Sequence, residues 1–234
     1  MFFGENFYAT VISETSRLAD WETAHYGDSS HLMSAIDGLK DISIVVPIID
    51  QSAILQTLVK LLDKRDAYTA FHSERVSLMA LRLCLAHCFP LTKTIIITSM
   101  ALVHDIGKIG IPDAILLKRG PLEDEEFDRI KQHTIMGADI LRQQKGLEPL
   151  CPGVLHHHER WDGKGYPEGL AGEDIPLGAR VIAVCDSIDA MLSNRVYRKA
   201  LTEAQAYEEI KKNRGIAYDP DIVDTCLKYW EHIL

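Results

Sequence analysis

Five stretches of this sequence place a histidine or an aspartate in register with apolar residues at helical spacing. In the first of them, His72 is followed by Val76, Met79 and Leu83 at steps of three or four residues. Residues spaced in this way share one face of an α-helix, and an apolar face packs against the core. The chain therefore has to fold so that imidazole and carboxylate groups from several helices enter its interior.

The same spacing recurs four more times along the chain, in the pairs Met100 and His104, Ile130 and His133, Val154 and His157, and Ile182 and Asp186. Asp105 and His158 adjoin two of these positions, and Asp189 shares the face of Asp186. One histidine on an apolar face is commonly a hydrogen-bonded core residue. Buried charges are normally paired or bound to a metal, so five such faces together predict a metal site.

The apolar periodicity predicts an all-α fold. Helices are expected from Ile54 to a break at Asp66, and then at about 69–87, 92–105, 121–146, 147–158, 179–192, 202–212 and 220–230. Thr69 is the expected N-cap of the second of these helices. Residues 161–178 are rich in glycine and proline and are expected to form a loop. Residues 1–50 show only a weak period, which predicts an N-terminal extension before a main domain at 51–234.

Composition and charge exclude several classes of protein. The formal net charge of -9 argues against a partner that is a nucleic-acid polymer, since such polymers need a basic face. The longest apolar run, at residues 42–49, is too short to span a bilayer, and the first residues lack the pattern of a signal peptide. Five cysteines without zinc or disulfide spacing indicate free thiols in a reducing compartment. We therefore expect a cytoplasmic protein with no membrane partner.

The ligand types narrow the choice of metal. No cysteine belongs to the set, which disfavours a structural zinc centre. Mixed imidazole and carboxylate ligands suit Fe, Mn, Zn or Ni. Two ions roughly 3.5–4 Å apart can hold both the attacking and the leaving oxygen of a phosphoryl displacement, and they lower the pKa of a bound water. A pair of ions held by this set would therefore suit a phosphoryl displacement.

Several sequence motifs in this chain resemble those of a known family. Residues 103–110 read VHDIGKIG and resemble the signature of the HD superfamily of metal phosphohydrolases. Residues 157–167 read HHERWDGKGYP and resemble the signature of its HD-GYP branch. Similar runs follow in the family's order at 175–180, 186–190 and 195–198. The resemblance covers about residues 50–230 and implies an HD-domain helical bundle, with residues 51–234 as the HD-GYP catalytic domain.

The resemblance also implies an activity. The HD-GYP family hydrolyses cyclic di-GMP, a bacterial second messenger, to linear pGpG, GMP or both, by attack of a metal-bridging hydroxide on a phosphodiester. Carried over to this chain, the family's metal ligands fall on His72, His104, Asp105, His133, His157, His158 and Asp186. Asp105 would bridge the ions and act in catalysis together with Lys108. Asp189 would contact one of the metal ligands and orient it without binding a metal itself.

The substrate-binding positions implied by the family are Lys108, Gly165, Tyr166, Pro167, Arg195 and Arg198. Some family members carry a third metal and a Glu four residues before the first histidine. Tyr68 occupies that position here and cannot supply a carboxylate, so two divalent transition-metal ions are expected. The expected metals are Fe and Mn, with Zn, Ni and Mg as alternatives.

Several alternatives stay open at this point. The chain is either an active cyclic di-GMP phosphodiesterase, a phosphodiesterase for a mixed cyclic dinucleotide, or a catalytically weak adaptor that binds ligand or partners. Hydrolysis of alarmone nucleotides is disfavoured by the Gly165–Tyr166–Pro167 loop. The segment 161–178 is expected to be a mobile lid, with a fixed wall as the alternative. Residues 1–50 are candidates for a homodimer contact or for docking a signalling protein.

Overall fold

The computed structural model describes residues 7–26, 46–65, 71–194 and 199–234 of the chain. Helices make up nearly all regular structure within these ranges. The exceptions are two isolated β-bridges, which join Asp162 to Ala171 and Arg214 to Tyr218. The prediction of an all-α fold is confirmed for the described part of the chain.

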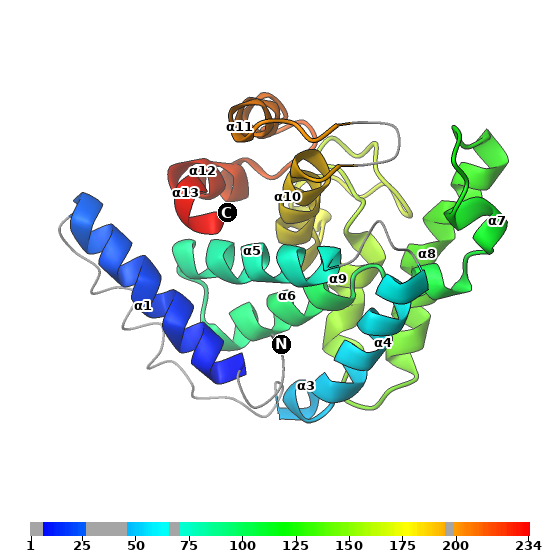
Figure 1. Cartoon of the computed structure of the whole chain (residues 1–234), viewed down its shortest axis with the longest axis horizontal. Helices are drawn as coiled ribbons and strands as arrows, with labels where there is room; N and C mark the ends of the chain where they lie inside the picture. The colour runs from blue at the N-terminus through cyan, green and yellow to red at the C-terminus, as the bar shows by residue number, and fades with distance from the viewer. Residues whose placement is uncertain (1–6, 27–45, 66–70, 195–198) are drawn as a thin grey trace.

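The helices follow one another with short connections. In chain order they are α1 (Phe7–Tyr26), α3 (Val46–Asp50), α4 (Ser52–Arg65), α5 (His72–Ala86), α6 (Leu91–Val103), η1 (Ile106–Gly110), α7 (Asp113–Leu116), α8 (Asp124–Arg142), η2 (Glu148–Leu150), α9 (Cys151–His156), η3 (Gly172–Asp174), α10 (Leu177–Leu192), α11 (Glu203–Lys212), α12 (Pro220–Lys228) and α13 (Trp230–Ile233). In Figure 1, α5 and α6 occupy the middle of the molecule, and α1 and α8 lie on opposite sides of them.

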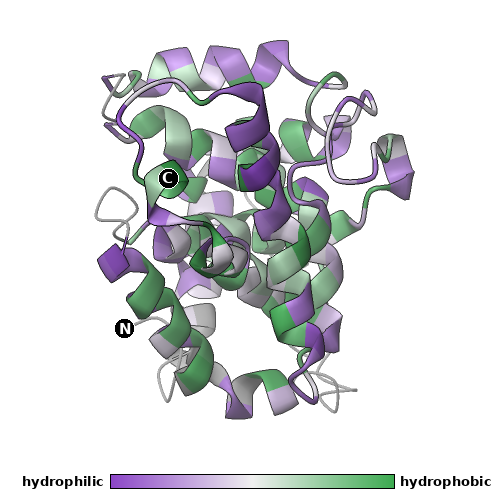
Figure 2. Ribbon diagram, turned by 90° about the vertical axis from the view of Figure 1, so that its right-hand side faces the viewer, coloured by the Kyte–Doolittle hydropathy of each residue, from purple (hydrophilic) through white to green (hydrophobic). Residues whose placement is uncertain are grey.

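The core forms where α5, α6, α9 and α10 pack together. Val76, Leu83, Ile95, Val154 and Val181 are fully or almost fully buried there. Burial of such side chains contributes about 1.5–3 kcal/mol each to folding. Figure 2 shows that individual helices combine hydrophobic and hydrophilic residues, as helices with one face toward a core do. The helices that the sequence marked with His and Asp therefore converge.

A glycine sets the closest approach between two of these elements. A β-carbon at Gly107 would lie 1.9 Å from the carbonyl oxygen of His133 and 2.4 Å from the backbone nitrogen of Gly137. Only glycine permits this contact, because backbone atoms cannot yield as a flexible side chain can. The turn η1, which follows Asp105, is thereby held against α8.

Several predicted helix ends differ from the observed ones. Helix α5 begins at His72, after Phe71 in the left-handed region (φ 63°). The predicted N-cap, Thr69, lies outside the described residues. Helix α6 ends at Val103, because the chain tightens into the 3-10 helix η1 at Ile106. Helix α8 ends at Arg142, four residues before the predicted end.

Two further predicted helices are each divided in the structure. The one expected at 147–158 consists of η2 and α9, and the one expected at 220–230 consists of α12 and α13. In addition, α7 occurs where the sequence predicts no helix.

Helix α1 lies in the segment that was least readable from sequence, and it packs on the main body. Glu14 forms an ion pair with Arg82 of α5, with Oε2 2.8 Å from Nε. The Tyr229 hydroxyl donates to the buried carboxylate of Glu22, and Leu18 is fully buried. The domain boundary near residue 50 stays a prediction. Among the described helices, none has both the length and the apolar character required to cross a membrane.

We predict that Leu18→Ala lowers the free energy of unfolding by about 2–5 kcal/mol, because it leaves a cavity between α1 and the core. Leu61→Ala in α4 is the matched control, since that leucine is 53% exposed and its loss should cost less than about 1 kcal/mol. Urea unfolding followed by circular dichroism measures both. Equal small effects would mean that α1 does not pack as described.

Candidate metal centre

All seven predicted ligands meet in the interior, each carried by the end or the face of a helix. His72 begins α5, His104 and Asp105 follow α6, His133 lies in α8, His157 and His158 follow α9, and Asp186 lies in α10. Their donor atoms form three overlapping groups, each within 4.8 Å: His133, His157 and His158; His72, His104 and Asp186; and His104, Asp105 and His157. The structure thus brings together the residues that the sequence singled out.

Backbone carbonyls hold three of the imidazole rings in one orientation. Nδ1 of His104 donates to the carbonyl of Ala101 over 2.7 Å. His133 does the same to the carbonyl three residues earlier over 2.7 Å, and His157 likewise over 2.8 Å. A carbonyl can only accept, so the hydrogen resides on Nδ1 and the Nε2 lone pair points to the centre. Metal-binding histidines are held in this way.

One contact shows that the centre suits a cation. Nε2 of His133 lies 3.3 Å from Nε2 of His157. Both atoms carry lone pairs when both Nδ1 atoms hold hydrogens, so neither ring can donate to the other. Two facing acceptors repel each other unless a positive ion lies near both of them. The arrangement of donors therefore fits a bound metal.

Asp105 lies between the group of His133, His157 and His158 and the group of His72, His104 and Asp186. Its Oδ1 is 3.4 Å from Nε2 of His133, and its Oδ2 is 3.4 Å from Nε2 of His104 and 3.8 Å from Nε2 of His72. Lys108, one turn further on, donates from Nζ to the same Oδ2 over 2.6 Å. The two carboxylate oxygens thus face different groups, which is the geometry that a bridging carboxylate needs.

Asp189 stands behind His72 instead of joining the donor groups. Nδ1 of His72 donates to Oδ2 of Asp189 over 2.7 Å, and Arg75 binds the same carboxylate, with Nε 2.5 Å from Oδ1. On its other side, Nε2 of His72 lies 3.3 Å from Oδ1 of Asp186. Such an outer carboxylate fixes the orientation of a ligand ring and raises its basicity.

Burial and charge set the protonation states in the centre. Burial lowers the pKa of His133, lowers that of His158 to about 4, and lowers that of His157 well below its usual value. Burial alone would raise the pKa of Asp105, but Lys108 and the imidazoles bring it well below its ordinary value. These three imidazoles are therefore neutral and the Asp105 carboxylate is ionised near pH 7, as metal binding requires.

His72 behaves differently because two carboxylates contact it. Burial alone would lower its pKa, but hydrogen bonds to Asp186 and Asp189 raise the pKa of His72 to about 9. The same contacts lower the pKa of Asp186 despite its burial. A cation placed between His72 and Asp186 would compete with this proton.

A cavity of about 410 Å³ adjoins the centre, with His157, His158 and Asp186 in its lining. Of the predicted substrate positions, Gly165 and Tyr166 line it, and Pro167 follows Tyr166 through a cis peptide bond. The Tyr166 ring packs against His158 with centroids 4.8 Å apart. Lys108 contacts Asp105 without lining this cavity. Arg195 and Arg198 lie outside the described residues.

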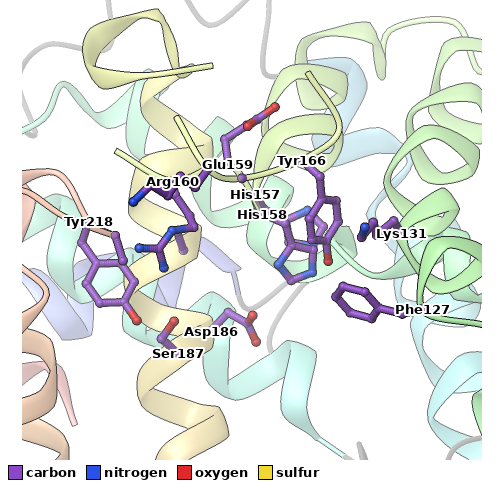
Figure 3. Close-up of a pocket in the computed structure, with 14 residues that line it drawn as sticks. Phe127, Lys131, His157, His158, Glu159, Arg160, Tyr166, Asp186, Ser187 and Tyr218 are labelled. Atoms are coloured by element: carbon purple, nitrogen blue, oxygen red, sulfur yellow. The ribbon is translucent and has the colours of Figure 1, made fainter. Parts of the chain in front are cut away.

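Other cavity residues were missed by reasoning from the sequence, namely Phe127, Lys131, Arg160, Ser187 and Tyr218. Figure 3 shows Phe127, Lys131 and Tyr166 on one side of His158 and Asp186, and Arg160, Ser187 and Tyr218 on the other. The sequence argument selected residues that lie on apolar helix faces, and these cavity residues are half-exposed, so it did not select them. One usable signal was Phe127, which is the single aromatic residue within the otherwise charged stretch 123–129.

The loop after α9 is tied down at several points. The buried carboxylate of Glu159 accepts from the backbone N–H of Glu168 at 2.8 Å and of Gly169 at 3.1 Å. A β-carbon at Gly165 would lie 2.4 Å from the backbone nitrogen of Arg160, so the loop folds closely on its own start. These contacts support the alternative of a fixed wall, while the mobile lid stays a prediction.

Comparison with known proteins gives a consistent result. The family model described as HD domain matches residues 56–222. The chain is 41% identical over 184 residues to a cyclic di-GMP phosphodiesterase of Thermotoga maritima, covering 77% of this chain and 50% of the relative. It is 34% identical over 185 residues to 3'3'-cGAMP-specific phosphodiesterase 2 of Vibrio cholerae, covering 77% and 35%.

The fold is shared with solved structures. A cyclic GMP-AMP specific phosphodiesterase of V. cholerae, V-cGAP3, superposes with a TM-score of 0.60 at 18% identity, covering 76% of this chain and 48% of that one. The chain spans about half the length of the first curated relatives that it matches.

We predict that Mn²⁺ added to metal-free protein raises its stability by about 2.7 kcal/mol when the free ion is at one hundred times its Kd. Asp105→Asn should remove most of this increase, because the variant loses the carboxylate between the two groups. Asp139→Asn, an exposed carboxylate on α8, is the control and should keep it. Thermal melts with and without Mn²⁺ measure the effect. An unchanged increase in Asp105→Asn would place the metal elsewhere.

Proposed function

We propose that this chain, which belongs to the HD domain family and to its HD-GYP branch, is a metal-dependent phosphodiesterase that hydrolyses cyclic di-GMP. The observation that carries the proposal is the convergence of seven imidazole and carboxylate groups beside a cavity. Relatives named for cyclic di-GMP and for 3'3'-cGAMP support a cyclic dinucleotide as the substrate class.

Two divalent ions would fit two of the three donor groups. His133, His157 and His158 would hold one ion, His72, His104 and Asp186 the other, and Asp105 would contact both. We expect Fe or Mn, with Zn, Ni or Mg as alternatives, because imidazole and carboxylate ligands accept all of these. When bound, the ions would supply Lewis-acid stabilisation of phosphate oxygens and a lowered pKa for bound water.

The chain's own residues would position the substrate and protect the centre. Asp189 holds the ring of His72 in place, and Lys108 places a cation beside Asp105. Tyr166 covers one face of His158, where it would limit the access of bulk water. Pro167 would hold this tyrosine in position, and Gly165 lets the loop approach closely. Arg195 and Arg198 are proposed to clamp a phosphate.

The charge around the cavity supports a small anionic ligand. Lys131, Arg160 and Lys164 line the cavity although the whole chain carries a formal net charge of -9. Local cations attract a phosphate group, whereas a nucleic-acid polymer would be repelled by the net negative charge of the chain. This distribution favours a dinucleotide over a nucleic-acid polymer.

One second candidate substrate has a specific observation in its favour. The curated relatives include 3'3'-cGAMP-specific enzymes that are 34–35% identical to this chain. A mixed cyclic dinucleotide is therefore the alternative substrate for the same site and the same chemistry.

Location and protein partners also belong to the proposal. The five free cysteines suit a reducing compartment, which supports a cytoplasmic location. Residues 1–50 stay candidates for a homodimer contact or for docking a signalling protein. Helix α1 already covers part of α5, so a partner bound there would contact both helices.

We predict that metal-loaded protein hydrolyses cyclic di-GMP and that Asp105→Asn lowers kcat by about a thousandfold or more, equivalent to about 4 kcal/mol. The reason is that Asp105 would set the spacing of both ions. Asp139→Asn is again the control and should keep the activity of the natural chain. Steady-state kinetics with the metal content checked in each sample decide the matter.

An Asp105→Asn variant with full metal content and near-normal kcat would place catalysis elsewhere. If metal-loaded protein of the natural sequence cleaves no cyclic dinucleotide but binds one tightly, the chain is a ligand-binding adaptor.

A further inference from the structure

The cavity has two unlike sides, separated by His158 and Asp186 (Figure 3). We call the side with Arg160, Ser187 and Tyr218 the arginine side, and the side with Phe127, Lys131 and Tyr166 the aromatic side. A cyclic dinucleotide also has two halves, each with one base and one phosphate. Its phosphates would lie at the centre, so its two bases would extend toward the two sides.

On the arginine side, one guanidinium is fixed by a carboxylate fork. Nε of Arg160 is 3.0 Å from Oδ1 of Asp162, and Nη2 is 3.0 Å from Oδ2. This fork uses one edge of the planar group, which leaves the edge formed by Nη1 and Nη2 for another planar acceptor pair.

The backbone also holds this side in shape. The N–H of Trp161 donates to the carbonyl of Ala217 over 3.1 Å, and that of Asp162 to the carbonyl of Ile216 over 2.9 Å. These bonds tie the start of the loop to the segment that carries Tyr218. The guanidinium is therefore positioned before any ligand arrives, and little conformational entropy is lost on binding.

The available edge of Arg160 distinguishes the two purines. Guanine presents two adjacent acceptors, O6 and N7, which match two parallel N–H donors. Adenine presents N7 beside the N6 amino group, which is a donor and would oppose a donor of the arginine. A purine on this side is therefore favoured when it is guanine.

Among the residues that the structure describes, those on the aromatic side form no comparable fork. The rings of Phe127 and Tyr166 lie edge to face with centroids 6.4 Å apart, and Nζ of Lys131 is 4.7 Å from the Phe127 centroid and 5.9 Å from that of Tyr166. Aromatic rings with a nearby cation stack on any base, because every base has a π-face. This side accepts guanine and adenine alike.

We propose that Arg160, held by Asp162, is a specificity-determining residue that reads guanine on one side of the cavity, while Phe127 and Tyr166 stack on either purine on the other side. The inference rests on the proposed phosphodiesterase function and deepens it. The substrate class becomes cyclic dinucleotides with at least one guanine. Cyclic di-GMP and 3'3'-cGAMP are the preferred substrates, and cyclic di-AMP is a poorer one.

The test is a comparison of kcat/KM for cyclic di-GMP, 3'3'-cGAMP and cyclic di-AMP with the metal-loaded full chain. The natural sequence should prefer the two guanine-containing substrates over cyclic di-AMP by about 5- to 150-fold, the discrimination of one bidentate contact. Arg160→Gln should reduce this preference or reverse it, because glutamine pairs with adenine N6 and N7. Arg160→Lys should weaken it, because lysine has no planar fork for Asp162 to hold in place.

Arg214→Gln is the matched control. Arg214 forms the same kind of fork with Asp224, with both N–O distances 2.6 Å, and it does not line the cavity. This variant should keep the purine preference. Thermal melts and metal content verify that each variant is folded and loaded.

The outcomes separate the two proposals. If the natural chain cleaves cyclic di-AMP as well as cyclic di-GMP, or if Arg160→Gln leaves the preference unchanged in folded and loaded protein, the assignment of Arg160 is wrong while the phosphodiesterase function stands. If no cyclic dinucleotide is cleaved, equilibrium binding of the same three ligands to the metal-loaded protein replaces kinetics. Equal affinity for all three would then overturn the inference on its own.

Discussion

The buried carboxylate of Asp105 constrains the placement of every helix end around it. A carboxylate away from water has to be compensated by positive charge or by hydrogen-bond donors. Here Lys108 supplies one donor, and the remaining space around the two oxygens is taken by Nε2 atoms of His72, His104 and His133. His104 and His133, whose Nδ1 hydrogens are bonded to backbone carbonyls, cannot supply that compensation by donating from Nε2. Cations between these atoms would compensate the negative charge of the carboxylate and bind the imidazole lone pairs.

The packing of the helices follows from this demand. The start of α5, the ends of α6 and α9, and the faces of α8 and α10 have to meet at one place, and short contacts allow them to do so. At Gly107 the turn after Asp105 reaches the backbone of α8, where a side chain would collide with the carbonyl of His133. The candidate metal centre and the apolar core are consequently parts of the same packing arrangement, and the cavity lies beside this centre.

Much of the centre could be predicted from sequence because its residues interrupt apolar helix faces at regular spacing. His72, His133 and Asp186 stand where a leucine would otherwise be expected, and the motifs around His104 and His157 resemble those of a known family. Two features could not be predicted in this way. Helix α1 combines one fully buried leucine, Leu18, with polar contacts such as Glu14 to Arg82, and this mixture leaves no strong apolar period. The two sides of the cavity combine half-exposed residues that are distant in the sequence, such as Arg160 and Tyr218.

The central claim is that the seven residues form one centre with two metal ions. Anomalous diffraction from crystals of Mn-loaded protein, recorded on both sides of the Mn absorption edge, tests this most directly. The account predicts two strong anomalous peaks per chain, one beside His133, His157 and His158 and one beside His72, His104 and Asp186, with Asp105 between them. A third well-occupied peak would show that the argument from Tyr68 is wrong. Peaks remote from Asp105 would contradict the account as a whole.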